Sequence, residues 1–233
     1  MKAKEETPKY INSTIKRLGF IRRFIHYFLL MLARLIFVFI PYEVEGKNNI
    51  PSEGIGTLFV SNHLSFIDPV FTAVAAFPQK RAIRFAGAKD IMKRWYFRWS
   101  KYELAFPVGR GAGEREKFIQ NAVILLENGE SVGIYPEGRR SLMKQLENVK
   151  IGAGWIAKHA GSTIKVIPVY ITGTDHLMPL GGFLRLSFMR KLKIRFGSPV
   201  DLSDYYLLPD SPKTSKVITE KIVENIKLMK KIE

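Results

Sequence analysis

Short apolar runs alternate with segments of helical period along the chain from residue 42 onward. Continuous apolar runs are typical of strands buried on both faces, and apolar positions three and four apart are typical of amphipathic helices. This alternation predicts an α/β fold with a sheet flanked by helices, rather than a sandwich or a bundle. The expected strands are 57–61, 83–86, 131–135, 164–171 and 192–196, and the expected helices are 69–77, 89–99, 114–127, 153–160 and 216–230.

The first 41 residues have a different pattern, in which a basic stretch, 1–23, precedes an apolar run, 24–40. At about 1.5 Å per residue the run measures about 25 Å, short of the roughly 30 Å hydrocarbon core, and His26 and Arg34 interrupt it. No small-residue cleavage site follows, as a signal peptide requires. We therefore predict an N-terminal segment, 1–41, of two amphiphilic helices in the membrane interface, ahead of an α/β domain, 42–233. The alternatives are a helix packed on a protein core and a tilted span.

Composition narrows the possible chemistry. Of the 233 residues 46% are hydrophobic, which is enough to build a core and excludes a wholly disordered chain. The absence of cysteine excludes a disulfide scaffold, a thiolate metal site and a cysteine nucleophile. A net charge of +16 favours phosphate-bearing partners, which are nucleic acid, anionic lipid or a small acidic substrate. Between residues 80 and 101 basic and aromatic residues alternate, and beside the N-terminal segment we interpret them as a second membrane-facing surface; the alternatives are a platform for nucleic-acid bases and ordinary packing.

His63 and Asp68 lie where a buried strand gives way to a helix. Five steps along a regular helix would rotate the two side chains about 140° apart, but a turn between strand and helix lets them meet. A carboxylate on one imidazole nitrogen fixes the tautomer and leaves the other nitrogen as a general base. The alternative is that Asp68 only caps its helix, with Pro69 at the first helical position, and that His63 is an ordinary loop residue.

Two more polar loops follow predicted strands. Arg110 lies in a glycine-rich turn that suits a phosphate, although a flexible connector is the alternative; Glu114 stands where a dinucleotide fingerprint needs its third glycine. The loop after strand 131–135 suits an anionic group beside a hydroxyl acceptor, or else is a solvated turn. Its polar candidates are Glu137, Gly138, Arg139 and Arg140.

Other active-site chemistries have little support in the sequence. Residues 129–133 match the G-x-S-x-G elbow of serine hydrolases, but that elbow needs a strand before it and a helix after it, and here the predicted order is reversed. Ser131 is therefore expected to begin a strand. The four histidines are scattered and show no metal-binding spacing, so we expect neither a metal site nor a cofactor.

The same polar loops carry a resemblance to a known family. Asn62-His63 with Asp68 resembles the N-H-x4-D motif of the glycerolipid acyltransferases, the family of 1-acylglycerol-3-phosphate acyltransferase. Residues 106–110, 135–141 and 166–173 resemble three further blocks, in the family's order, and the resemblance covers roughly 42–205. Four blocks in order are far more specific than one. The chain departs from the family at Arg139, where threonine is usual, so the family's substrate arginine falls on Arg140.

The resemblance implies a glycerolipid-acyltransferase-like fold with a mixed sheet flanked by helices, and a membrane-docking role for the N-terminal helices. It implies transfer of a fatty acyl group from acyl-CoA or acyl carrier protein to the free hydroxyl of 1-acylglycerol 3-phosphate, which gives phosphatidic acid. His63, oriented by Asp68, would be the general base. The acceptor's phosphate would be held by Arg110, Glu137, Gly138 and Arg140, with Arg139 as a weaker addition.

The expected partners are anionic membrane lipids, a lysophospholipid acceptor and the acyl donor, without nucleic acid. The positive residues of the amino end favour a monotopic protein on the cytoplasmic face of the bacterial inner membrane. The first alternative is a related acyltransferase acting on glycerol 3-phosphate, another lysophospholipid or an aminolipid. The remote alternative is a non-catalytic protein that binds a membrane surface or nucleic acid.

Overall fold

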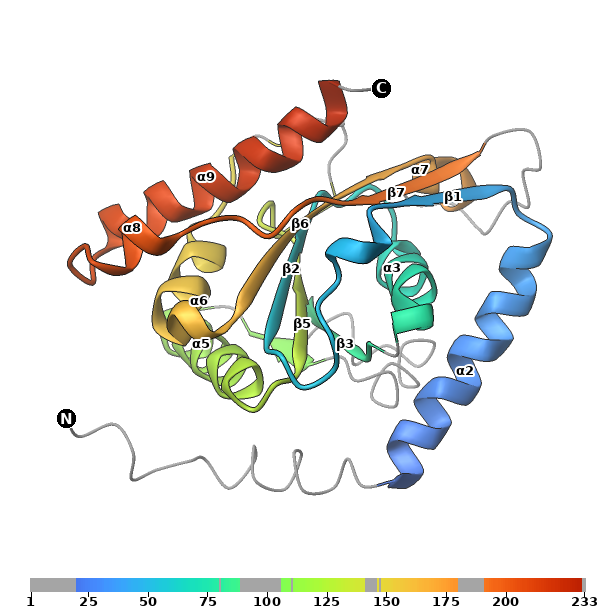
Figure 1. The fold of residues 1–233 in the computed structure, drawn as a ribbon, viewed down its shortest axis with the longest axis horizontal. Coiled ribbons are helices and arrows are strands. Elements are labelled where there is room, and N and C mark those ends of the chain that lie inside the picture. The colour runs from blue at the N-terminus through green and yellow to red at the C-terminus, as the bar shows by residue number, and fades with distance from the viewer. Residues whose placement is uncertain are drawn as a thin grey trace.

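The structure is a computed structural model that describes residues 20–79, 81–88, 106–109, 111–140, 146, 148–179 and 191–231 (Figure 1). Its helices are α2 (Phe20–Val38), α3 (Asp68–Ala76), α5 (Ala112–Glu127), α6 (Gly152–Ala160), α7 (Thr174–Leu177), α8 (Ser203–Tyr206) and α9 (Pro212–Lys231). Its strands are β1 (Tyr42–Glu45), β2 (Thr57–Ser61), β3 (Ile83–Ala88), β4 (Phe106–Val108), β5 (Ser131–Ile134), β6 (Lys165–Thr172) and β7 (Leu192–Phe196).

The strands form one mixed sheet in the order β1-β7-β6-β2-β5-β3-β4. The five strands from β6 to β4 run parallel to one another, β7 is antiparallel to β6, and β1 is parallel to β7. The predicted mixed α/β sheet is confirmed. Because parallel strands end at one edge, the loops after β2, β5, β3 and β4 all leave the sheet on the same side.

Strands β2 and β5 are buried on both faces because helices cover each side of the sheet. Figure 1 shows α5, α6 and α9 on one side of the sheet, and α3 with α2 on the other. Alternate residues of β2 divide between the two cores: Leu58 and Val60 join the cluster under α5, α6 and α9, and Phe59 joins the cluster under α3. The three central residues of β2 are thus all apolar although they face opposite sides of the sheet, which explains the continuous apolar run in its sequence.

Close packing between α6 and α9 requires a glycine. A Cβ added to Gly154 would lie 1.8 Å from the backbone oxygen of Ser215 in α9. The backbone nitrogen of Gly154 also donates to Oγ1 of Thr219 at 2.9 Å. Gly152, in the same helix, has open space where its Cβ would be. Of these two glycines, only Gly154 therefore lies where the backbones of α6 and α9 touch.

Opposite charges join the edge strand β1 to β7. Glu45 accepts a hydrogen bond from Nε of Arg195 and pairs with Nζ of Lys193 at 2.8 Å. These two hydrogen bonds lower the pKa of Glu45 from its ordinary 4.5 to about 2, and the bond from Arg195 has the larger effect. Glu43 makes a further pair with Lys191 at 2.8 Å. Cross-strand charge pairs thus fix the register of an edge strand that has few apolar residues.

Helix α2 has two apolar faces. One packs on α3, where the rings of Phe37 and Phe71 stack with their centroids 5.4 Å apart. The other face and the following turn expose large apolar side chains, namely Phe24, Phe28, Met31, Leu32, Leu35, Ile36, Val38 and Phe39. In the described part of the chain, no helix has the length and apolar content needed to span a membrane. The first predicted amphiphilic helix, within residues 1–19, lies outside the described residues.

The basic aromatic stretch differs in part from its interpretation as a membrane-facing surface. Arg81 and Arg84 are buried, with 2% and 4% of their surface exposed, and Phe85 joins the core beneath α3. Arg84 and Phe85 belong to β3 and Arg81 lies just before it, so these three residues lie in the interior and not on a membrane-facing surface. Lys80 and residues 89–101, including the predicted helix 89–99, lie outside the described residues.

Candidate functional site

The two residues of the predicted dyad meet at the carboxyl end of β2. Nδ1 of His63 lies 2.8 Å from Oδ2 of Asp68. The side chain of His63 is 15% exposed, whereas that of Asp68 is fully buried. A carboxylate only accepts hydrogen bonds, so Nδ1 is the donor of this pair, and in the neutral imidazole Nε2 carries a lone pair. No described residue hydrogen-bonds Nε2. The free nitrogen of the imidazole is therefore available to a ligand.

Asp68 is anchored by the turn that it closes. Its Oδ2 also accepts the backbone N–H groups of Leu64, at 2.7 Å, and Ser65, at 2.8 Å. Asp68 is the first residue of α3, and no side chain caps that helix at Ile67. The alternative role of Asp68 as a helix cap is thus wrong, because its carboxylate reaches back to the amides before it. Three donors on one oxygen orient the carboxylate toward the imidazole.

The imidazole is also held by an aromatic ring. The rings of His63 and Tyr135 stack with centroids 4.0 Å apart and planes 13° apart. Burial, with the negative charge of Asp68 as a smaller cause, raises the pKa of Tyr135 well above its ordinary value. Its hydroxyl is buried and has no hydrogen-bond partner among the described residues. Sequence reasoning placed Tyr135 at the end of a strand but gave it no role.

Two neighbouring polar residues fix the backbone of the dyad loop. Oε1 of Glu137 accepts the backbone N–H of His63 at 3.0 Å. The side-chain amide of Asn62 bonds both backbone groups of Ile171 in β6, each at 2.8 Å. Gly138, next to Glu137, has a φ of 61°, a left-handed conformation that favours glycine. The acid of the 135–141 loop thus supports the histidine, and its contact with a substrate stays a prediction.

The two arginines of that loop have different environments. Arg139 is exposed, whereas Arg140 is half-buried and its Cζ lies 3.6 Å from the centroid of the Phe66 ring, within the dyad turn. Burial lowers the pKa of Arg140 from its ordinary value, and the charge of Asp68 opposes that shift. Its buried Nη1 has no hydrogen-bond partner in the part of the chain that the structure describes. A guanidinium held by a ring keeps N–H groups for an anion.

The remaining candidate, Arg110, lies outside the described residues. Its neighbours locate the loop: β4 ends at Val108, beside β3, and α5 begins at Ala112. The turn therefore leaves the sheet at the edge where His63 lies. The contact between Arg110 and a phosphate stays a prediction.

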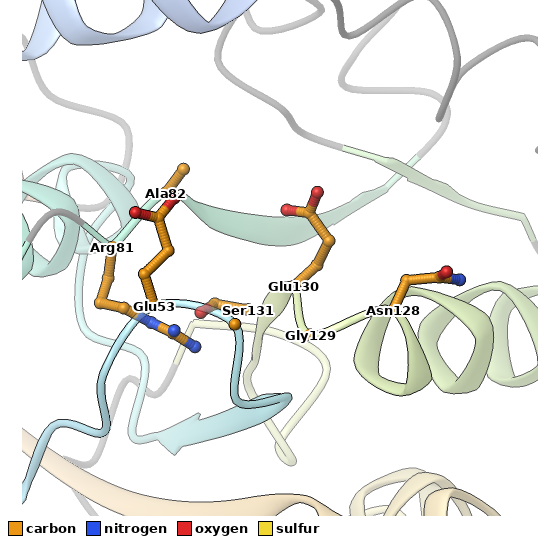
Figure 2. Close-up of a pocket in the computed structure, with 8 residues that line it drawn as sticks. Glu53, Arg81, Ala82, Asn128, Gly129, Glu130 and Ser131 are labelled. Atoms are coloured by element: carbon orange, nitrogen blue, oxygen red, sulfur yellow. The ribbon is translucent and has the colours of Figure 1, made fainter.

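A small hollow lies at the opposite edge of the sheet (Figure 2). Arg81 lines it, and its guanidinium donates to the backbone oxygens of Ser52 and Ile55, both at 2.7 Å, and to Oγ1 of Thr57 at 2.8 Å. Ser131 also lines the hollow, at the start of β5. This confirms that Ser131 begins a strand and is no nucleophile elbow. Arg81 holds the turn before β2 through these hydrogen bonds, which explains why an arginine is buried here.

Comparison with known proteins identifies relatives of this chain. The family model described as Acyltransferase matches residues 41–172, which include every described candidate. The chain is 28% identical over 163 residues to the chloroplastic 1-acyl-sn-glycerol-3-phosphate acyltransferase of Arabidopsis thaliana, a match that covers 69% of this chain and 44% of that protein. It is 26% identical over 186 residues to the 1-acyl-sn-glycerol-3-phosphate acyltransferase of Bacillus subtilis, covering 79% and 86%.

A solved structure has the same fold. The crystal structure of the 1-acyl-sn-glycerophosphate acyltransferase of Thermotoga maritima aligns with a TM-score of 0.64 and 23% identity, over 95% of this chain and 90% of that one. The chain spans about half the length of the plant and algal relatives that it matches. At 23% identity, the agreement with the Thermotoga protein concerns only the arrangement of strands and helices described above.

Proposed function

Because the chain belongs to the acyltransferase family, we propose that it transfers a fatty acyl group to the free hydroxyl of 1-acylglycerol 3-phosphate. The donor is the thioester of acyl-CoA or acyl carrier protein, and the product is phosphatidic acid. The relatives support this acceptor, because those of Arabidopsis, Streptococcus pneumoniae and Bacillus subtilis are all named 1-acyl-sn-glycerol-3-phosphate acyltransferases. The observation that carries the proposal is the anchored pair of His63 and Asp68 at 2.8 Å.

In the proposed reaction His63 is the general base. Its Nε2 takes the proton of the acceptor hydroxyl while that oxygen attacks the thioester carbonyl carbon. The carbon–sulfur bond then breaks, and the leaving thiolate takes the proton from the imidazolium, so the products are an ester and a free thiol. Asp68 stabilises the imidazolium through Nδ1. Because the acceptor oxygen attacks the thioester directly, the proposed reaction forms no covalent acyl-enzyme, and the chain has no cysteine that could carry one.

The acceptor's phosphate is assigned to the cationic side of the same edge. Arg140 is the main candidate, because its guanidinium adjoins the dyad turn and its buried Nη1 has no partner in the described ranges. Arg110 and the exposed Arg139 are further cations for the same group. Glu137 and Gly138 shape the loop that carries the arginines. A forked guanidinium suits a phosphate better than the point charge of lysine.

The exposed face of α2 is assigned to a membrane surface. Eight large apolar side chains of this helix and its following turn, from Phe24 to Phe39, are solvent-exposed, and the opposite face is fixed on α3. An amphiphilic helix of this kind binds in the plane of the interface. The protein would then be monotopic, on the cytoplasmic face as the basic amino end favours, and a lipid acceptor would reach the site without crossing water.

The test is release of free thiol from acyl-CoA with a panel of acceptors. We expect turnover with 1-acylglycerol 3-phosphate and little with glycerol 3-phosphate, other lysophospholipids or an aminolipid. His63→Ala should lower kcat at least a hundredfold, as loss of a general base does. His159→Ala is the matched control, because His159 also pairs with an acid, Asp210 at 3.1 Å, but on the surface. Retention of more than a few per cent of turnover in His63→Ala would contradict the proposed base.

A further inference from the structure

Three rings form a column behind the reactive edge of the sheet. Phe85 of β3 stacks on Tyr135 with centroids 5.9 Å apart and planes 16° apart. Tyr135 in turn stacks on His63 at 4.0 Å. The column thus runs from the sheet's core to the imidazole.

A glycine in the interior strand β5 makes room for the column. Phe85 is the register partner of Gly133 in β5. A Cβ added to Gly133 would lie 2.4 Å from the ring of Phe85. Glycine weakens a strand interior, so it is found where another group must approach the backbone closely. Here that group is the ring which supports Tyr135.

A hydrogen bond alone does not fix the plane of an imidazole. The last side-chain torsion of histidine is broad, so a ring held only through Nδ1 can tilt about that hydrogen bond. The carboxylate of Asp68 fixes the position of Nδ1. A parallel ring at 4.0 Å limits the tilt, and so determines where Nε2 points. A misplacement of about 1 Å in a reacting group costs roughly a hundredfold in rate.

We propose that the ring of Tyr135, supported by Phe85 over Gly133, is a positioning element that fixes the imidazole plane of His63 for acyl transfer. This inference rests on the proposed function. The ring acts and the hydroxyl does not, because the hydroxyl is buried with no hydrogen-bond partner among the described residues. Tyr135 is a positioning residue, since it acts on the reaction only through His63.

The test compares two substitutions of the same residue. Tyr135→Leu removes the ring, and we expect kcat to fall roughly ten- to hundredfold while the acceptor's KM stays within about twofold. Tyr135→Phe keeps the ring, and its kcat should stay within about twofold of the unaltered protein. Rates of thiol release are measured in detergent micelles and normalised to the folded fraction from thermal melts. A second variant, Phe85→Leu, should lower kcat in the same sense but less.

The matched control is Tyr42→Leu. Tyr42 packs against two rings, Phe37 at 6.0 Å and Phe71 at 5.9 Å, in the core beneath α3, without touching His63. It should lower the melting temperature without lowering kcat in micelles. A folded Tyr135→Leu protein with unchanged kcat would overturn the inference, and so would Tyr135→Phe losing as much kcat as Tyr135→Leu. Turnover that survives His63→Ala would instead contradict the proposed function.

Discussion

The carboxylate of Asp68 contributes a negative charge and a set of hydrogen bonds, and the substitution Asp68→Asn removes the charge while it can keep the hydrogen bonds. In Asp68→Asn an amide replaces the fully buried carboxylate. All three donors, Nδ1 of His63 and the amides of Leu64 and Ser65, converge on one oxygen, Oδ2. The other oxygen has no partner in the described part of the chain. The amide oxygen can therefore take the place of Oδ2 while its NH2 takes the place of the unpaired oxygen.

The two backbone donors decide the orientation of that amide. A flipped side chain would set its NH2 against two N–H groups, which leaves buried donors unsatisfied at about 1–3 kcal/mol each. The unflipped amide keeps the proton on Nδ1 of His63, so the tautomer survives and only the negative charge is lost. Two unit charges about 4 Å apart interact by about 4 kcal/mol at an effective dielectric of 20, and a charged hydrogen bond exceeds a neutral one by about 1 kcal/mol. These limits correspond to a fall in kcat of roughly five- to a thousandfold.

The assay is the rate of thiol release at saturating acyl-CoA and acceptor, with thermal melts to establish the fold. Asp68→Ala is the contrasting variant, because it removes the acceptor of all three donors and should lower the free energy of unfolding by several kcal/mol. A folded Asp68→Asn protein with kcat within about threefold of the unaltered one would refute the reasoning, since the charge would then do nothing for the imidazolium.

Three further predictions concern packing, pH and acceptor binding. Gly154→Ala should lower the free energy of unfolding by about 2–3 kcal/mol, because its Cβ meets the backbone of α9, whereas Gly152→Ala in the same helix should not; thermal melts compare them. Above pH 4.5 Glu45 stabilises the fold through its two basic partners, and this is lost as pH falls toward its lowered pKa of about 2, so the melting-temperature difference from Glu45→Gln should vanish over that window. Phe66→Leu should raise the acceptor's KM roughly three- to tenfold with little change in kcat, because Arg140 loses the ring that holds it; Michaelis curves test this.

The bounds of two strands were predicted best from the sequence, one buried on both faces and one that alternates buried and partly exposed residues. The expected ranges 57–61 and 192–196 coincide with β2 and β7, because both strands are bounded by polar turns. Strand β1 was missed: its alternate glutamates pair with basic residues of β7, about 150 positions away in sequence, and no local pattern reveals such partners. Local patterns predict elements, whereas edge strands depend on what lies beside them.

The candidate site shows the same division. The pairing of His63 with Asp68 was predictable, because both residues lie in one short turn. The stacking of Tyr135 on His63 was not, because it joins two strands that only the sheet order brings together. The hydrogen bond that the backbone N–H of His63 donates to Glu137 was missed for the same reason. Resemblance to a motif named these residues, but only the fold supplies their contacts.

Helix α3 links the proposed lipid-facing helix to the chemistry. Asp68 is its first residue, and one turn later Phe71 stacks on Phe37 of α2. If a membrane surface holds the exposed apolar face of α2, these contacts would also set the height and tilt of the imidazole above that surface. Membrane binding and the orientation of the proposed base would then depend on the same packing contacts.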